Sequence, residues 1–400
     1  QALLNADNPY NFLQHLPCAA QEYPLRSEEP LFDKLMYEES IDILKKEKTI
    51  VPYQEFYRYA LQDYPSRGVN LRGMTDYNVE IICENKVIGE IDPIGARGTL
   101  YKDAIYQHLG RKYLSLDLDL DKKICTVEKM DVDYYTEAVW QARIEMTEED
   151  EQKKLNESKI AFGYIYVNKQ PKLYKKIRER SYENIGYGPI TLPAFDYDTT
   201  GFSLQAPQEW RQTLEGIDKR FISSAYYGLG YVLRHTGPLI CMADIKDIDS
   251  DVSLIEIKDD ENETKNFESA LFLYDKIEGG VGYAEKIYEK INICLSLCKE
   301  IIEQCECTSG CPSCVPPLPP GIDTEELELF LIESNASVVC TLSLIEMLLY
   351  GFIIVPKVVF KNRKLDAPVD APEQDEDRLE AQKKLQRASK ILQKKRERLH

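Results

Sequence analysis

The pattern of apolar and polar residues begins as short helical stretches. Residues 32–35 and 40–46 repeat apolar side chains at helical spacing, and residues 54–59 predict a further short helix. Two or three short helices followed by a strand are typical of a winged-helix unit, and a generic helical connector fits the same pattern. We therefore expect a winged-helix-like module over residues 1–75.

The pattern changes to short alternating runs after residue 76. Apolar runs at 79–83 and 87–91 flank Glu84, Asn85 and Lys86, which predicts a β-hairpin. More short runs follow as far as residue 128. Short strands with turns at this spacing predict a small antiparallel β-barrel over residues 76–150.

A longer apolar strand follows at 160–167. Phe162, Tyr164 and Tyr166 alternate onto one face of it. These aromatics either pack against a neighbouring sheet or helix, which we favour, or stack on nucleic-acid bases.

From residue 207 the chain is mostly helical. A buried strand at 272–275 leads into Gly279, Gly280 and Gly282, which open another helix. These glycines fit a tight strand-to-helix turn better than a phosphate-binding loop, because the chain contains no Gly-Lys-Ser or Gly-Lys-Thr.

Four cysteines within ten residues carry the clearest chemistry: Cys305, Cys307, Cys311 and Cys314. Four thiolates around one centre form the tetrahedral ligand set of structural Zn²⁺, and such a closed site leaves no position for substrate. Cysteine-only ligation also suits an iron–sulfur cluster, and disulfides are a third possibility. We favour zinc and expect the cluster to hold structure rather than perform chemistry.

Composition adds limits to this picture. The 400 residues are 43% hydrophobic and 30% charged, which is ordinary for a globular chain of two to four domains. Eleven cysteines, of which four cluster, suit reduced thiols in the cytoplasm beside one metal site. The apolar runs are too short to span a membrane, so no membrane partner is expected. The first residue is Gln1 rather than Met, which suggests a piece of a longer protein or a processed product.

The charge is unevenly distributed. The formal net charge of −18 argues against uniform coating by nucleic acid. Residues 153–180 nevertheless hold nine Lys or Arg against two Glu, and so do residues 378–400. These stretches are solvated faces or local DNA contacts, and the candidate contacts in the first are Lys169, Lys172, Lys175, Lys176 and Arg178. The candidate contacts in the second stretch lie between Lys383 and Arg398. An acidic stretch at 366–377, which predicts a linker, precedes it.

In this order the elements resemble the region after the motor of superfamily 2 DEAD/DEAH-box DNA helicases, in particular the MrfA (YprA-like) group. The resemblance covers about four-fifths of the chain, and its most specific parts are the cysteine cluster and the glycine turn. Other residues that carry it lie at 8–10, 15–20, 69–73, 87–89, 104–110, 132–136, 188–193 and 274–282.

The resemblance implies an α+β multi-domain fold. Its parts are a winged-helix-like module, a small β-barrel and an α/β zinc-binding helicase-associated domain over residues 151–345. Beyond the resemblance, composition predicts an acidic linker with a basic helical tail over residues 346–400. By position, it implies that Cys305, Cys307, Cys311 and Cys314 are the zinc ligands. It also implies that these parts guide or clamp DNA. The ATPase motifs of the family have no counterpart in this chain.

Two functions remain in view. The first is a non-catalytic accessory region of an ATP-dependent DNA helicase in DNA repair or phage defence, which binds single-stranded or forked DNA weakly and works with motor domains in cis or in trans. The second is a stand-alone zinc-stabilised scaffold subunit that assembles with a separate helicase or nuclease.

Overall fold

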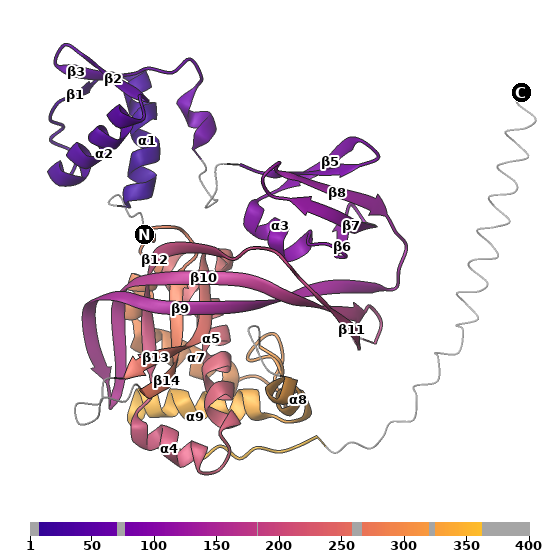
Figure 1. The fold of residues 1–400 in the computed structure, drawn as a ribbon. Helices are drawn as coiled ribbons and strands as arrows, with labels where there is room; N and C mark the ends of the chain where they lie inside the picture. Colours follow the sequence, from indigo (N-terminus) through magenta and orange to yellow (C-terminus); the bar gives the residue numbers. More distant parts are fainter. Residues whose placement is uncertain (1–7, 70–76, 182, 258–265, 320–324, 362–400) are drawn as a thin grey trace, which may run out of the picture. The chain divides into compact units, whose positions relative to one another are not determined.

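The computed structural model describes residues 8–69, 77–181, 183–257, 266–319 and 325–361, and these combine helices with three β-sheets (Figure 1). The predicted α+β class is confirmed. The described residues from 8 to 359 belong to one compact unit.

The N-terminal module packs two helices against a three-stranded sheet of order β1-β3-β2. Leu16, Ile41 and Leu44 are at the centre of its core. The elements are α1 (Pro9–Glu22), β1 (Leu25–Arg26), α2 (Lys34–Lys46), β2 (Ile50–Tyr53), β3 (Phe56–Tyr59) and the 3-10 helix η1 (Pro65–Gly68).

The short helix predicted at 54–59 is wrong, because these residues form the turn and second strand of the β2–β3 hairpin. Gln54 adopts a φ of 57°, which reverses the chain and pairs Tyr53 with Phe56. Tyr57 and Tyr59 then pack against the core of the module. Aromatic side chains favour a half-buried strand, and here that preference outweighs the helical spacing.

The next sheet has five strands in the order β5-β4-β8-β7-β6. The predicted hairpin is present as β4 and β5, and Val79, Ile81 and Cys125 lie in the core. The expectation that every pair is antiparallel needs correction, because β4 and β8 run parallel. The elements are β4 (Val79–Cys83), β5 (Lys86–Ile91), α3 (Pro93–Thr99), β6 (Ile105–His108), β7 (Arg111–Asp119) and β8 (Ile124–Lys129).

A six-stranded sheet forms the largest part of the structure. Its order is β11-β10-β12-β14-β13, and β9 pairs with the free side of β10. Its strands are β9 (Tyr134–Leu155), β10 (Ser158–Arg178), β11 (Asn184–Pro189), β12 (Phe195–Gln205), β13 (Ile248–Ile257) and β14 (Asn266–Asp275). The far end of the β9–β10 hairpin, together with β11, forms a three-stranded extension (134–143, 169–178 and 184–189) that we call the arm.

Helices cover one face of this sheet (Figure 1). Leu204 and Leu273 from the sheet share a core with Leu229 of α5. The helices are α4 (Gln208–Glu215), α5 (Arg220–Cys241), η2 (Ile245–Asp247), α6 (Tyr283–Glu289), α7 (Ile291–Glu303), α8 (Glu325–Glu333) and α9 (Ala336–Tyr350). No helix in the described ranges is long and apolar enough to cross a membrane.

The aromatic row on β10 is divided between core and surface. Phe162 is buried and lies 5.5 Å from the ring of Tyr288 on α6, as the packing interpretation predicts. Tyr164, farther along the same face, is exposed. The row therefore extends beyond the helices that cover its first member.

Two of the predicted domain limits fall within elements. Strand β9 continues past residue 150, and α9 continues past residue 345. The arm also binds the small sheet, because the backbone N–H of Ile105 donates to Thr136 Oγ1 at 2.8 Å. The division into domains stays a prediction.

Candidate metal centre

The four-cysteine loop lies directly after α7. Helix α7 has its C-cap at Gln304, and Cys305 follows it at once. Gly310 has a φ of 94°, and a Cβ there would lie 2.3 Å from the carbonyl oxygen of Val315. Only glycine fits such a turn. A second turn is closed by the backbone N–H of Cys314, which donates to the carbonyl of Cys311 at 3.1 Å.

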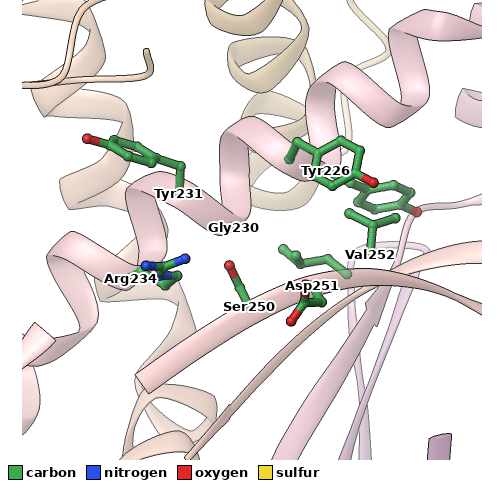
Figure 2. A pocket seen from close by; sticks show the side chains of 9 residues that line it. Tyr226, Gly230, Tyr231, Arg234, Ser250, Asp251 and Val252 are labelled. Carbon is green, nitrogen blue, oxygen red and sulfur yellow. The ribbon is translucent and has the colours of Figure 1, made fainter. Parts of the chain in front are cut away.

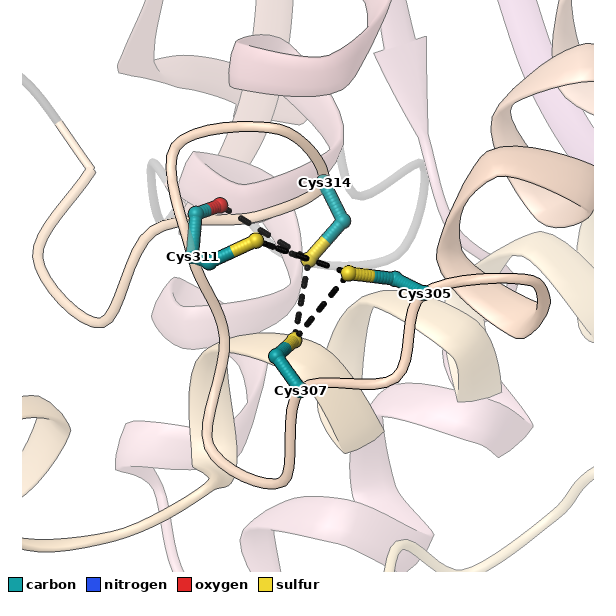
Figure 3. A group of neighbouring side chains, drawn as sticks. All are labelled: Cys305, Cys307, Cys311 and Cys314. Carbon is teal, nitrogen blue, oxygen red and sulfur yellow. Dashed lines mark hydrogen bonds between the residues drawn. The ribbon is translucent and has the colours of Figure 1, made fainter.

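These turns bring all four sulfurs together, as Figure 3 shows. The Sγ–Sγ distances are 3.4 Å for Cys305–Cys307, 3.5 Å for Cys305–Cys311, 3.4 Å for Cys307–Cys314 and 3.7 Å for Cys311–Cys314. A tetrahedral ion with Zn–S bonds of about 2.3 Å requires sulfurs about 3.8 Å apart. The sulfurs therefore fit one zinc ion after a shift of a few tenths of an ångström.

The loop is packed against helices α5 and α9. The hydroxyl of Tyr231 on α5 donates to the carbonyl of Pro312 at 2.7 Å. Helix α5 also approaches α9 closely at Gly228, where a Cβ would lie 1.8 Å from Thr341 Oγ1. The four-sulfur centre is therefore attached to the helical layer that covers the large sheet.

The other cysteines of that layer are separate from the cluster. Cys294 and Cys298 are fully buried on α7, and burial raises the pKa of the Cys298 thiol to about 12. Its sulfur lies 3.2 Å from Thr236 Oγ1. Cys294 and Cys298 are therefore core residues rather than additional ligands.

Lys169, a predicted DNA contact, lies in a buried ion-pair cluster instead. Its Nζ is 2.8 Å from a carboxylate oxygen of Asp249 and 2.8 Å from one of Asp251. Alternation along β10 places Lys169 on the same face as Ile165 and Val167, which point into a buried core. Only 14% of its side chain is exposed, so it is not available to a phosphate.

Arg234 and Tyr274 complete this group, which we call the Lys169 cluster. Arg234 of α5 lies 3.0 Å from Asp249, and the Tyr274 hydroxyl donates to Asp251 at 2.5 Å. Burial alone would raise the pKa of Asp249, but the charges of Lys169 and Arg234 outweigh it and lower that pKa to about 2. Burial likewise opposes a charge on Lys169, and the two aspartates reverse this and raise its pKa.

A small cavity between α5 and β13 lies beside this cluster (Figure 2). Tyr226, Tyr231 and Arg234 line it from the helix, and Ser250 and Asp251 line it from the strand. The Nε atom of Arg234 is buried and has no hydrogen-bond partner among the described residues.

The other predicted DNA contacts lie on the arm and differ in their accessibility. Lys175 is held 2.5 Å from Glu328 of α8, and both side chains are mostly buried. Lys172 and Arg178 are exposed, and Arg178 has a loose ion pair at 3.9 Å with Asp133. Lys176 lies over the ring of Tyr134 and is half-buried. Lys172, Lys176 and Arg178 are thus the accessible members, and the basic stretch from Lys383 to Arg398 lies outside the described residues.

Sequence reasoning missed the role of Asp275. Its buried carboxylate accepts hydrogen bonds from the backbone N–H groups of residues 281–284, at 2.7–3.3 Å. Burial raises the pKa of this carboxyl to about 6, against the effect of the four donors. The predicted turn at Gly279–Gly282 is therefore present, and the chain's own carboxylate already occupies the amides of residues 281–284.

Asn8 joins this turn to the N-terminal module. Its Oδ1 caps α1 by accepting from the N–H of Asn11, and its Nδ2 donates to the carbonyls of Glu278 at 2.9 Å and Gly280 at 2.6 Å. The side chain is completely buried. Both ends of this contact lie in segments that carry the family resemblance, which was the signal available in the sequence.

Two family models match the chain. The MrfA Zn-binding domain matches residues 229–315, which include all four clustered cysteines. The winged helix domain of ATP-dependent helicase HRQ1 matches residues 4–74.

Individual proteins match over most of the chain. It is 32% identical to the uncharacterized ATP-dependent helicase YprA of Bacillus subtilis, over 83% of this chain and 43% of that protein. A crystal structure of helicase MrfA is similar at 26% identity and a TM-score of 0.50, over 82% of this chain and 44% of that one. A second crystal structure, of MrfA bound to DNA, has 30% identity and a TM-score of 0.48, over 83% and 43%. The chain spans less than half the length of each of these proteins.

Proposed function

Because the chain matches the C-terminal region of MrfA/YprA-like helicases, we propose that it is the accessory region of an ATP-dependent DNA helicase. The observation that carries this proposal is the match over 83% of the chain, which extends from the winged-helix module to the four-cysteine loop. The role proposed is non-catalytic: the chain guides or clamps DNA in the cytoplasm, in repair or phage defence, while motor domains in cis or in trans hydrolyse ATP.

The proposed role of the metal centre is structural. Cys305, Cys307, Cys311 and Cys314 would supply all four ligands of a zinc ion, which leaves no position for water or substrate. The ion would fix the loop after α7 against α5 and α9. The match to the MrfA Zn-binding domain supports zinc over an iron–sulfur cluster.

The proposed DNA contact is the accessible basic part of the arm. Lys172, Lys176 and Arg178 are within seven residues of one another. Lys172 and Arg178 are exposed and Lys176 is half-buried, whereas Lys169 and Lys175 are engaged in ion pairs with carboxylates that are themselves mostly buried. MrfA has been crystallised with DNA, which supports a DNA partner for this chain as well. Because the net charge of −18 repels phosphate at a distance, we expect weak binding of single-stranded or forked DNA that depends on short-range contacts.

The test of this proposal compares two triple variants in DNA binding. Replacement of Lys172, Lys176 and Arg178 by Glu should remove most of the affinity for single-stranded DNA. Each lost phosphate contact should also reduce the log–log salt slope by about 0.7. The control replaces Lys46, Lys86 and Lys102, which are exposed on other parts of the chain, and changes the net charge equally. It should retain most of the binding.

The same preparation tests the division of labour. We expect no ATP hydrolysis by the chain alone, and faster unwinding by its motor when the chain is present. If the arm variant binds DNA as tightly as the wild type, the DNA contact proposed here is wrong. If the motor unwinds DNA equally well without the chain, the accessory role is wrong and the scaffold function takes its place.

A further inference from the structure

The N-terminal module is joined to the glycine turn by polar contacts rather than by a shared core. Its apolar core, around Leu16, Ile41 and Leu44, is separate from the core that the large sheet shares with its helices. Among the described residues, the closely packed pairs of elements that include a part of the module all lie within the module. Its attachment to the rest of the chain therefore depends little on apolar burial.

Asn8 joins the module to the turn through the two hydrogens of its side-chain amide. The Oδ1 atom serves the module itself, because it accepts from the backbone N–H of Asn11 at the start of α1. The Nδ2 group serves the turn, because it donates to the carbonyls of Glu278 and Gly280. The side chain is completely buried. Its oxygen is thus satisfied within the module alone, and its nitrogen only while the turn is in reach.

The turn presents its carbonyls in a shape that does not need the module, and we call residues 278–280 the socket. Gly279 has a φ of 74°, and a Cβ there would lie 2.8 Å from Asn8 Nδ2 and 2.8 Å from the ring of Tyr10. The backbone N–H of Gly279 donates to the carbonyl of Asp198 on β12 at 2.8 Å. The carboxylate of Asp275 holds the amides that follow. The large sheet therefore fixes the socket, and glycine leaves room for Asn8 to enter it.

We propose that the N-terminal module docks and undocks as a folded unit, and that the hydrogen bonds of Asn8 in the socket are the contact that forms and breaks. The module keeps its core and the socket keeps its own hydrogen bonds in both states, so undocking exposes little apolar surface. Each intramolecular hydrogen bond contributes little net free energy, because water replaces it when it breaks. The undocked state is therefore reached by a local opening that needs far less free energy than global unfolding. This device goes beyond the proposed function and requires no DNA.

Asn8→Asp tests the contact without removing the helix cap. The aspartate keeps the oxygen that caps α1 and replaces the Nδ2 donor by an oxygen that repels the two carbonyls. In native-state hydrogen exchange, the amides of residues 278–280 should exchange at least about tenfold faster than in the wild type, because two hydrogen bonds are lost. The amides of α2 should be unchanged. The matched control is Asn156→Asp, which loses the same kind of donor to two carbonyls of α9 and should leave both segments unchanged.

A second pair of variants tests the socket from its own side. Gly279→Ala places a methyl group where Asn8 and Tyr10 approach the turn. Its control is Gly282→Ala, at a φ of 88°, where the nearest atom to a Cβ is 3.8 Å away on Glu285. Both substitutions strain the backbone at a positive φ, so the difference between them reports the space that the module needs. Exchange at residues 278–280 should be at least about tenfold faster in Gly279→Ala than in Gly282→Ala.

Three results would overturn the inference. If the amides of α2 accelerate together with those of residues 278–280 in Asn8→Asp, the module unfolds rather than undocks. If neither segment responds, Asn8 does not hold the module in place. If residues 278–280 of the wild type exchange only through global opening, with the same urea dependence as the buried strand β14, the module has no undocked state. None of these results bears on DNA binding by the arm, so the proposed function is tested separately.

Discussion

The four-cysteine loop and the Lys169 cluster both contact helix α5, but they stabilise its position by different interactions. The loop brings four thiols within 3.4–3.7 Å, and these groups attract one another little until a cation joins them. The Lys169 cluster carries its own cations, and each carboxylate in it lies within 3.0 Å of one. The four-cysteine loop therefore depends on an added ion, and the Lys169 cluster depends on charged side chains of the chain itself. Different perturbations should disrupt the two regions.

The largest effect should come from removing the metal. Apparent binding energies of structural zinc are on the order of 10–16 kcal/mol, and most of this is folding energy. Cys311→Ser should therefore unfold the helical layer over 206–345 and leave the small sheet over 79–129 folded. Elemental analysis should find one zinc per chain in the wild type, and hydrogen exchange should localise the loss.

The control is Cys18→Ser, which changes a half-buried cysteine outside the loop and should keep the zinc. Iron, or no metal, in the wild-type protein would contradict the prediction. A Cys311→Ser variant with an unchanged thermal transition would mean that the centre contributes nothing to stability.

The second largest effect should come from Lys169→Met, because it leaves two buried carboxylates with fewer counter-charges. Breaking a buried pair in this way costs about 3–5 kcal/mol. The control on the same strand is Lys159→Met, whose ion pair with Glu149 is exposed and should be worth less than about 1 kcal/mol. Urea unfolding of both variants measures the contrast, and equal losses would refute the built-in role of the Lys169 cluster.

Acid should weaken the Lys169 cluster over a defined pH range. The pKa of Asp249 is lowered from 3.8 to about 2 in the folded state, so its ionised form stabilises the fold above pH 3.8. This contribution, about 2 kcal/mol, is lost as the pH falls towards 2. The stability difference between wild type and Lys169→Met should therefore shrink over that range, as measured by unfolding at each pH. A constant difference would mean that Asp249 is not titrating there.

The smallest effect concerns the ion pair between the arm and α8. Lys175 faces one carboxylate, whereas Lys169 faces two, so Lys175→Met leaves fewer buried charges without a partner and should cost less than Lys169→Met. DNA affinity should change little, because the lysine is occupied by Glu328. A large loss of DNA affinity in Lys175→Met would show that Lys175 contacts DNA.

The grouping of the four sulfurs could be predicted from the sequence because all four cysteines lie within ten residues. The β4–β5 hairpin was predictable for the same reason, since its turn and both strands are adjacent. Local spacing carries such information directly, and it also located the glycine turn at 279–282.

The Lys169 cluster could not be predicted in this way. Lys169 and Asp249 are 80 residues apart, on strands β10 and β13 that two other strands separate in the sheet. The basic stretch at 153–180 therefore contained both accessible and buried lysines with no local mark to separate them. The β2–β3 hairpin was missed because its aromatic residues fit both a helix face and a half-buried strand.

Asn8 also implies an order of events during synthesis. Its Nδ2 bonds the carbonyl of Glu278, 270 residues later in the chain. At 5–20 residues per second, a ribosome needs about 15 to 55 seconds to make the intervening polypeptide. The Oδ1 atom of Asn8 can cap α1 early. During that interval its Nδ2 group lacks the carbonyls of Glu278 and Gly280 and is hydrated instead. The contact between the N-terminal module and the glycine turn thus forms only after residues 278–280 have left the ribosome.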